Sequence, residues 1–161
     1  MSVAVEPRRK QGNQAEKWKP NIYFSPDVAG SGVGELSFYY LLDHVKEALM
    51  DAERVINRGF PSMEEVKKIL EEKVMEKLNQ YQNIEYVEYY FDEGAVWDEI
   101  EVGNTVVSRT YDAIDWLTVA IADGPEILFD VHADYVVAEE GNKRRVVYFK
   151  INSIKLNVTR F

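Results

Sequence analysis

An alternation of aspartate and histidine near the C-terminus contains the residues whose types are best suited to chemistry. Asp130, His132 and Asp134 are spaced two residues apart within a run of strand-forming residues. Side chains two apart on a strand share a face, so we expect the three on one face, about 7 Å apart along the strand. Such a group could hold a metal ion, or an aspartate could orient His132 as a general base.

The simpler interpretation treats these residues as ordinary polar positions. Aspartate and histidine alternating with apolar residues are typical of any strand with one face in solvent. We therefore predict no catalytic residue, no metal site and no cofactor. The catalytic interpretation, with His132 acting beside Asp130 and Asp134, is kept as the alternative.

The strand that carries the alternation is predicted to pair with the last residues of the chain. Residues 126–138 lead to a turn at 139–142, and residues 143–161 follow. Opposite charges favour a register that places Asp134 opposite Lys150. The same register pairs Tyr135 with Phe149, Val137 with Val147, and His132 with Asn152.

The apolar positions of the last strand change face partway along it. They are odd-numbered up to Ile151 and even-numbered from Ile154 onward. Because side chains alternate strictly along a regular strand, the change at Asn152 and Ser153 predicts a β-bulge or a passage from one core to another.

The rest of the chain predicts two helices followed by strands. Apolar residues recur at intervals of three and four over residues 35–58 and 63–81. Ser62 and Glu65 fit a capping box at the start of the second helix. Strands are predicted at residues 84–91 and 95–102 and over 105–121, the last as one long bent strand or as a strand followed by a helical turn.

This order predicts an α+β fold in a single domain, residues 35–161. An αα-hairpin would pack on about five long antiparallel strands that form a curled sheet or an open barrel. Cystatin-like cones and open barrels are architectures built from such strands.

Residues 1–34 are predicted to form an extended N-terminal arm, because they are rich in proline and glycine. The arm contains apolar residues that a plain linker would lack. They are expected to dock on the protein's own domain or on a neighbouring subunit. The predicted interface residues are Trp18, Ile22, Tyr23 and Phe24, together with Arg8 and Arg9.

The net charge of −9 is distributed in blocks along the 161 residues. Residues 84–140 hold fifteen acidic residues and one basic residue, whereas residues 141–161 hold six basic residues and no acidic one. Blocks of opposite sign predict complementary surfaces, and the acidic block disfavours nucleic-acid binding because it repels a polyanion. The absence of cysteine excludes thiolate catalysis and Cys-type metal sites. No membrane span and no secretion signal are expected, so the predicted location is the cytoplasm or a virion.

These observations favour a non-enzymatic structural protein that self-associates or docks in a larger assembly, such as a virus particle. One alternative is a small-molecule-binding protein, or a cofactor-independent lyase or isomerase with a cone-shaped fold. Its pocket would combine His132 and Asp130 with Asp112 or Asp115, among the aromatic residues of the sheet. The aromatic residues that would line this pocket are Tyr86, Tyr89, Tyr90, Trp97, Tyr111 and Trp116.

Another alternative is an inhibitor whose acidic block mimics nucleic acid.

Overall fold

The computed structural model describes residues 33–160 apart from residues 80, 82–83, 123 and 125. Side chains are described from residue 41 to residue 157, with the same gaps. The arm predicted over residues 1–34 therefore lies almost wholly outside the described residues. So do its predicted interface residues Arg8, Arg9, Trp18, Ile22, Tyr23 and Phe24.

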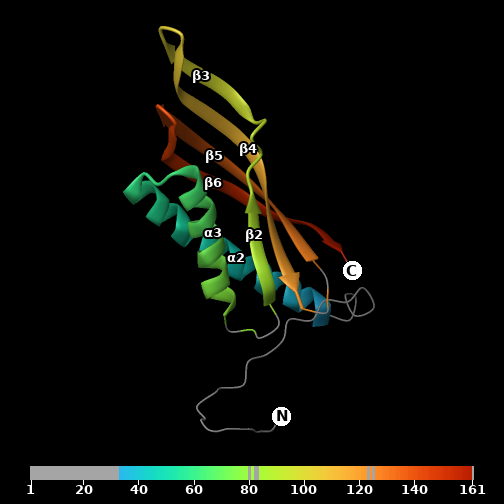
Figure 1. Ribbon diagram of the computed structural model, residues 1–161. Coiled ribbons are helices and arrows are strands. Elements are labelled where there is room, and N and C mark those ends of the chain that lie inside the picture. The colour runs from blue at the N-terminus through green and yellow to red at the C-terminus, as the bar shows by residue number, and fades with distance from the viewer. Residues whose placement is uncertain (1–32, 80, 82–83, 123, 125, 161) are drawn as a thin grey trace, which may run out of the picture.

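Within the described residues, two helices precede five antiparallel strands, which confirms the predicted α+β fold. The sheet is curled and unclosed (Figure 1). Its strand β4 pairs with three others, β2, β3 and β5. Four strands follow the order β2-β4-β5-β6, and β3 pairs with the other half of β4. The elements are α2 (Val33–Gly59), α3 (Met63–Leu78), β2 (Ile84–Tyr90), β3 (Val96–Val102), β4 (Thr105–Ile121), β5 (Glu126–Glu140) and β6 (Lys143–Arg160).

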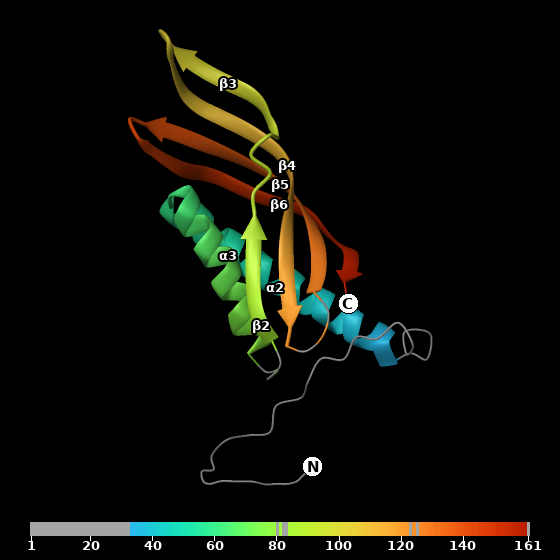
Figure 2. The same cartoon turned by 45° about the vertical axis from the view of Figure 1, so that its right-hand side comes forward.

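Both helices lie on one face of the sheet (Figure 2). The predicted capping box begins α3: the Ser62 hydroxyl accepts from the Glu65 N–H, and the Glu65 carboxylate accepts from the Ser62 N–H. One stripe of α3 is fully buried against the sheet, as its apolar spacing predicts. Neither described helix is long and apolar enough to cross a membrane. The buried residues of α3 are Val66, Leu70, Val74 and Leu78.

The two faces of the sheet differ because one is covered by the helices and the other is not. Odd-numbered residues of β5, such as Phe129 and Val131, are buried against the helices. Even-numbered residues, such as Asp130 and His132, lie on the uncovered side and are only half-buried. We call this second side the open face. The core therefore lies between the sheet and the helices.

The closing hairpin largely follows the predicted register. Asp134 lies opposite Lys150 and Tyr135 opposite Phe149. The side chains of Asp134 and Lys150 are both described, and they form no ion pair with each other. The Asp134 carboxylate instead accepts a hydrogen bond from Asn152 at 3.0 Å.

Two predicted pairs are wrong by one residue because β6 contains bulges. Val137 pairs with Val146 and His132 with Ser153, which leaves Val147 and Asn152 as extra residues. The bulge at Asn152 is the predicted one, and it keeps Ile151 and Ile154 both buried on the core side. The change of face is therefore a bulge and not a passage between two cores.

Helix side chains occupy the outer edges of β6 and β2. Asn57 of α2 donates to the Phe149 C=O and accepts from the Phe149 N–H, both at 2.8 Å, as a neighbouring strand would. Glu53, one turn earlier, accepts from the Ile151 N–H at 2.6 Å. These contacts satisfy edge groups that would otherwise be available to another chain.

The β2 edge is satisfied in the same way by α3. The Tyr89 N–H donates to the Glu71 carboxylate at 2.9 Å, and the Lys67 ammonium donates to the Tyr89 C=O at 2.8 Å. Lys67 and Glu71 also pair with each other at 2.7 Å. Each helix therefore binds the backbone of one edge strand as well as the core face.

Replacing Asn57 by alanine is expected to destabilise the protein by about 1–2 kcal/mol, because both backbone groups of Phe149 lose their partner. The measurement is urea unfolding followed by circular dichroism. The control is Arg58→Ala, an exposed neighbour for which no partner is described; it should change stability by less than about 0.5 kcal/mol. Equal effects of the two substitutions would contradict the role of Asn57.

Candidate functional site

The Asp-His-Asp alternation lies on the open face, as expected for alternate residues of one strand. The structure adds a partner from β4: Asp112 lies directly opposite Asp134 and diagonally from His132. The His132 Nε2 and an Asp112 carboxylate oxygen are 2.7 Å apart. The two side chains are 41% and 57% exposed.

This group could bind a cation through one nitrogen and two carboxylates. One ligand atom each from Asp112, His132 and Asp134 lies within 4.8 Å of the others. Asp112 could alternatively orient the His132 imidazole for proton transfer. In either case the three side chains face solvent, on the side of the sheet away from the helices.

Asp130, which the sequence grouped with His132, is directed to different partners. Its carboxylate accepts a hydrogen bond from Asn157 at 2.7 Å, and its strand neighbours are Trp116 and Lys155. The exchange of Asp130 for Asp112 follows from the register between β4 and β5, which no local sequence pattern reveals.

Among the described residues, one carboxylate is fully buried, that of Asp115 on the core side of β4. Its Oδ2 accepts from the Tyr89 hydroxyl at 2.7 Å. Its Oδ1 accepts from the Asp92 N–H at 2.8 Å and from the Tyr135 hydroxyl at 3.2 Å. Three donors therefore surround the carboxylate, and they hold the chain after β2 against the middle of the sheet.

Burial dominates the ionisation of this cluster. It raises the pKa of Asp115 to about 6, although the three hydrogen bonds act in the opposite direction. Burial also raises the pKa of Tyr89 and of Tyr135, so both hydroxyls stay protonated and remain donors. Tyr135 stacks between Tyr111 and Phe149, which places the cluster in a packed aromatic core.

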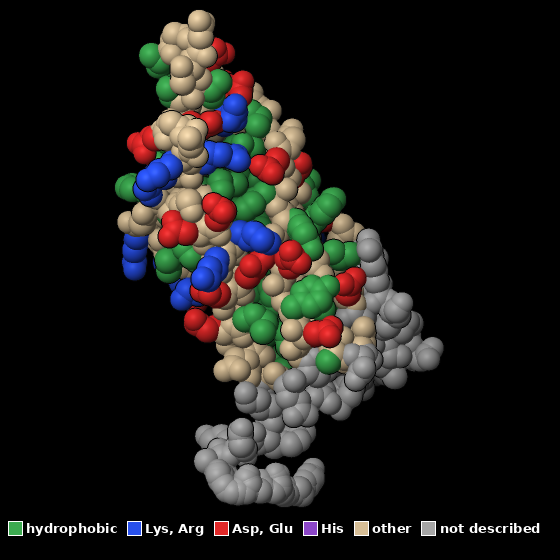
Figure 3. Space-filling view, in the orientation of Figure 1, with side chains coloured by type: hydrophobic (Ala, Val, Ile, Leu, Met, Phe, Trp, Pro, Cys, Tyr) green, Lys and Arg blue, Asp and Glu red, His purple; other side chains and the backbone are tan. Residues whose placement is uncertain are grey.

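The β3–β4 hairpin forms a second unusual feature, because it extends past the helices (Figures 1 and 2). Within the described residues no strand pairs with the outer edge of β3. Trp97 and Val102 are each 67% exposed, and Ile100 is 54% exposed. Figure 3 shows hydrophobic and acidic side chains together on this projection at the top of the molecule. We call the outer edge of Val96–Val102, with these side chains, the β3 edge.

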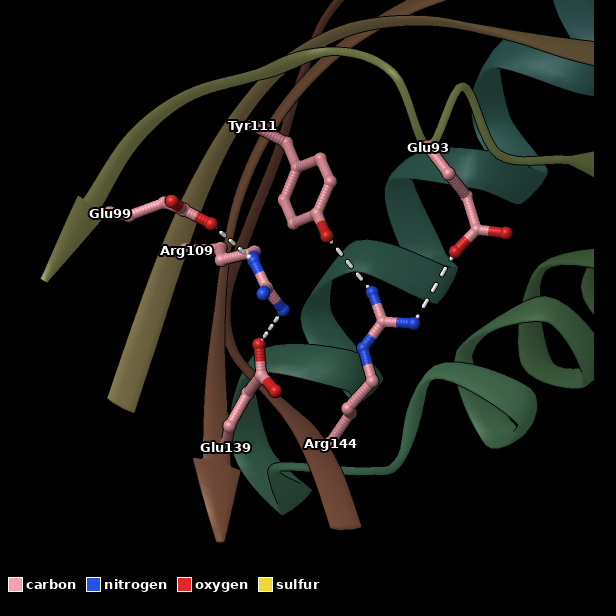
Figure 4. Close-up of polar contacts among 6 residues, drawn as sticks. All are labelled: Glu93, Glu99, Arg109, Tyr111, Glu139 and Arg144. Atoms are coloured by element: carbon pink, nitrogen blue, oxygen red, sulfur yellow. Dashed lines mark hydrogen bonds and ion pairs between the residues drawn. The ribbon is translucent and has the colours of Figure 1, made fainter. Parts of the chain in front are cut away.

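Two arginines hold the base of the hairpin (Figure 4). Arg109 of β4 pairs with Glu99 of β3 at 2.6 Å and with Glu139 of β5, and so joins three strands. Next to it, Arg144 of β6 donates to the Tyr111 hydroxyl at 2.9 Å and lies 3.3 Å from Glu93 in the chain before β3. The arginines are thus occupied by carboxylates and a tyrosine, and they fix the direction of the hairpin.

A groove lies at the other side of the sheet, between α2 and the outer edge of β6. It has a volume of about 490 Å³, and its surface is mostly apolar. Lys46 and Met50 contribute from α2, and Ile151 to Lys155 contribute from β6. We call this the β6 groove. It begins next to Ile151, where the hydrogen bonds from α2 to the strand end.

The aromatic residues singled out in the sequence are divided between core and surface. Tyr89 and Tyr111 are buried, whereas Trp97 and Trp116 are exposed. Tyr86 and Tyr90 lie on the open face at intermediate to high exposure. These six residues therefore do not line one pocket.

The raised pKa of Asp115 makes stability depend on pH. The pKa of Asp115 is about 6 in the folded protein and 3.8 for an ordinary aspartate. The contribution of Asp115 to the free energy of unfolding is therefore fully present below about pH 4 and is lost as pH rises through 6. The loss is about 3 kcal/mol. Asp115→Asn does not titrate. Relative to the wild type, the variant should therefore gain about 3 kcal/mol between about pH 4 and pH 7.5 in urea unfolding.

Asp98→Asn, on the exposed β3, controls for the loss of one negative charge. A difference between Asp115→Asn and the wild type that stays constant with pH would contradict the assignment.

Comparison with known proteins gives no relative. No protein-family model matches the chain, and no curated protein and no solved structure matches it either. The function must therefore be argued from the geometry described above.

Proposed function

We propose that this protein is a non-enzymatic subunit of a protein assembly and that its copies self-associate through the β3 edge. The observation that carries the proposal is the contrast between edges. Helix side chains bind the backbone at the β2 and β6 edges, whereas no described residue pairs with the outer edge of β3.

An exposed edge strand is a template for pairing with another chain, and proteins that remain monomeric protect such edges. Here the protection is present at Tyr89 on the β2 edge and at Phe149 and Ile151 on the β6 edge, and it is missing along β3. The strand is also presented on a projection beyond the helices, where a partner can approach it from the side. These features favour strand addition as the mode of contact.

The side chains of the β3 edge are those of a contact surface. Trp97, Ile100 and Val102 are the exposed large apolar residues of β3. Tryptophan is enriched among the residues that contribute most to binding energy at protein interfaces. Burying these three side chains against a partner would remove from water the apolar surface that the hairpin exposes.

The enzyme alternative has less support. Its proposed base, His132, lies on the open face and not between the helices and the sheet. Asp115 does point into the core, but its two oxygens accept three hydrogen bonds within a packed aromatic cluster. Neither of the two described surface grooves is lined by His132 or Asp115.

The nucleic-acid mimic also has less support. A mimic needs carboxylates spread over one exposed surface. On the open face, Asp130 and Asp134 have Lys155 and Lys150 opposite them on β6. The acidic strands are therefore flanked by a basic one, and their field is partly neutralised. The settings in which we expect a subunit of this kind are a virus particle or a cytoplasmic multi-subunit complex.

The test is the oligomeric state of the full chain with the β3 edge altered. Wild-type protein should associate in analytical ultracentrifugation at micromolar concentrations. Trp97→Ser should weaken association at least about thirty-fold, because a central tryptophan typically contributes 2 kcal/mol or more. Trp116→Ser is the matched control: Trp116 is 55% exposed, but it lies on the open face and not at an edge. It should leave association unchanged.

Two results would refute the proposal. One is a wild-type protein that stays monomeric at every concentration and salt level. The other is an equal loss of association in the Trp97 and Trp116 variants, which would assign the contact to general surface hydrophobicity.

A further inference from the structure

We propose that the β6 groove is the receptor for the β3 edge of a second copy, so that copies join head to tail. This inference rests on the proposed function and names the partner surface. It follows from three properties of the groove: backbone groups of β6 that no described residue bonds, an apolar lining, and two lysines that form no ion pair with any described residue.

The backbone of β6 is available at the groove. Phe149 and Ile151 turn their outer N–H groups to Asn57 and Glu53 of α2. Hydrogen-bonding direction alternates along an antiparallel strand, and the bulge at Asn152 shifts that alternation by one residue. Ile154 and Leu156 therefore turn their N–H and C=O groups outward. No described residue bonds them there, because α2 presents Met50 and Lys46 at this level.

The apolar lining of the β6 groove matches the apolar side chains of the β3 edge. Its lining includes Ile151 and Ile154 of β6 and Met50 of α2, which is 41% exposed. The β3 edge presents Trp97 and Ile100. An added strand would thus form hydrogen bonds through its backbone and place its apolar side chains against the groove.

Charge identifies β3 as the occupant. Asp98 and Glu101 are the two acidic residues of β3 that have no ion pair among the described residues, since Glu99 is held by Arg109. Within the same part of the chain, Lys46 and Lys155 at the groove also lack an ion pair. Opposite charges that are uncompensated on two surfaces of one chain are complementary when copies of the chain meet.

Charge also disfavours two other occupants. Pairing β3 with β3 of a second copy would place Asp98, Glu99 and Glu101 near their own equivalents, and like charges across a strand pair are destabilising. The N-terminal segment, residues 1–20, holds five basic and two acidic residues. It would therefore meet Lys46 and Lys155 with charge of the same sign.

The positions of the two surfaces make the contact heterologous. The β3 edge lies on one side of the sheet, on the projecting hairpin, and the β6 groove lies along the middle of β6, the edge strand on the other side of the sheet. One copy can therefore donate β3 to one neighbour and accept β3 from another. Contacts of this type produce rings or open filaments.

The experiment mixes two full-chain variants that each lack one half of the contact. Trp97→Asp removes the donor, and Lys46→Glu with Lys155→Glu removes the receptor. Each variant alone should show association at least ten-fold weaker than wild type. Mixed at equal concentration they should form a one-to-one heterodimer with near wild-type affinity, because one functional pair of surfaces remains. Analytical ultracentrifugation of differently labelled variants measures this.

Two further variants test charge and location. Asp98→Lys with Glu101→Lys should restore association when mixed with the Lys46→Glu and Lys155→Glu variant. Lys68→Glu with Lys73→Glu makes the same charge change on α3, which does not contribute to the groove, and should associate as wild type does.

The outcomes separate this inference from the proposed function. If Trp97→Ser abolishes association but the Lys46 and Lys155 variant associates normally, the β3 edge is an interface and the β6 groove is not its partner. If the mixture of the Trp97→Asp variant with the Lys46→Glu and Lys155→Glu variant stays monomeric, the β6 groove is likewise not the partner of the β3 edge. Loss of association in Ile22→Asp with Phe24→Asp, with the receptor variant unaffected, would assign the contact to the N-terminal segment. A monomeric wild type would overturn both proposals.

Discussion

The fold depends on satisfying the backbone at the edges of a long antiparallel sheet. The strands β4, β5 and β6 each span fifteen residues or more, well above the usual ~5–6. A sheet of such strands exposes rows of N–H and C=O groups at its edges unless other parts of the chain bind them. Asn57 and Glu53 of α2 and Lys67 and Glu71 of α3 perform this task. The helices thus cover one face of the sheet and also bind backbone groups along part of its β2 and β6 edges.

The hairpin of β3 and β4 lies beyond the reach of the helices, and its edge has no such cover. Arg109 of β4 links the hairpin to the rest of the sheet, because it pairs with Glu99 of β3 and with Glu139 of β5. A projecting edge without cover is a template on which a strand of another chain can pair. The head-to-tail contact proposed here would satisfy the β3 edge and the uncovered part of β6 through backbone hydrogen bonds between copies, where the helices use side chains within one copy. It also accounts for acidic charge on β3 and basic charge at the β6 groove.

The open face illustrates how much of a candidate site a sequence can predict. The spacing of Asp130, His132 and Asp134 correctly places them on one face, because alternation is a local property of a strand. The hydrogen bond of His132 goes to Asp112, twenty residues away. That partner depends on the offset between β4 and β5. Asp115 is a similar case: its burial and its raised pKa arise only when Tyr89, Asp92 and Tyr135 assemble around it.

The sequence alone determined the elements and their order. Apolar periodicity, the capping box at Ser62 and the change of face at Asn152 predict helices, strands and a bulge because each depends on neighbouring residues. The charge pair at Asp134 and Lys150 also predicted the local register of the closing hairpin. Only the tertiary structure decided which edges are covered, which face is open and which residues meet across strands. Those features depend on where α2 and α3 pack relative to the sheet, and long-range packing leaves no short pattern in the chain.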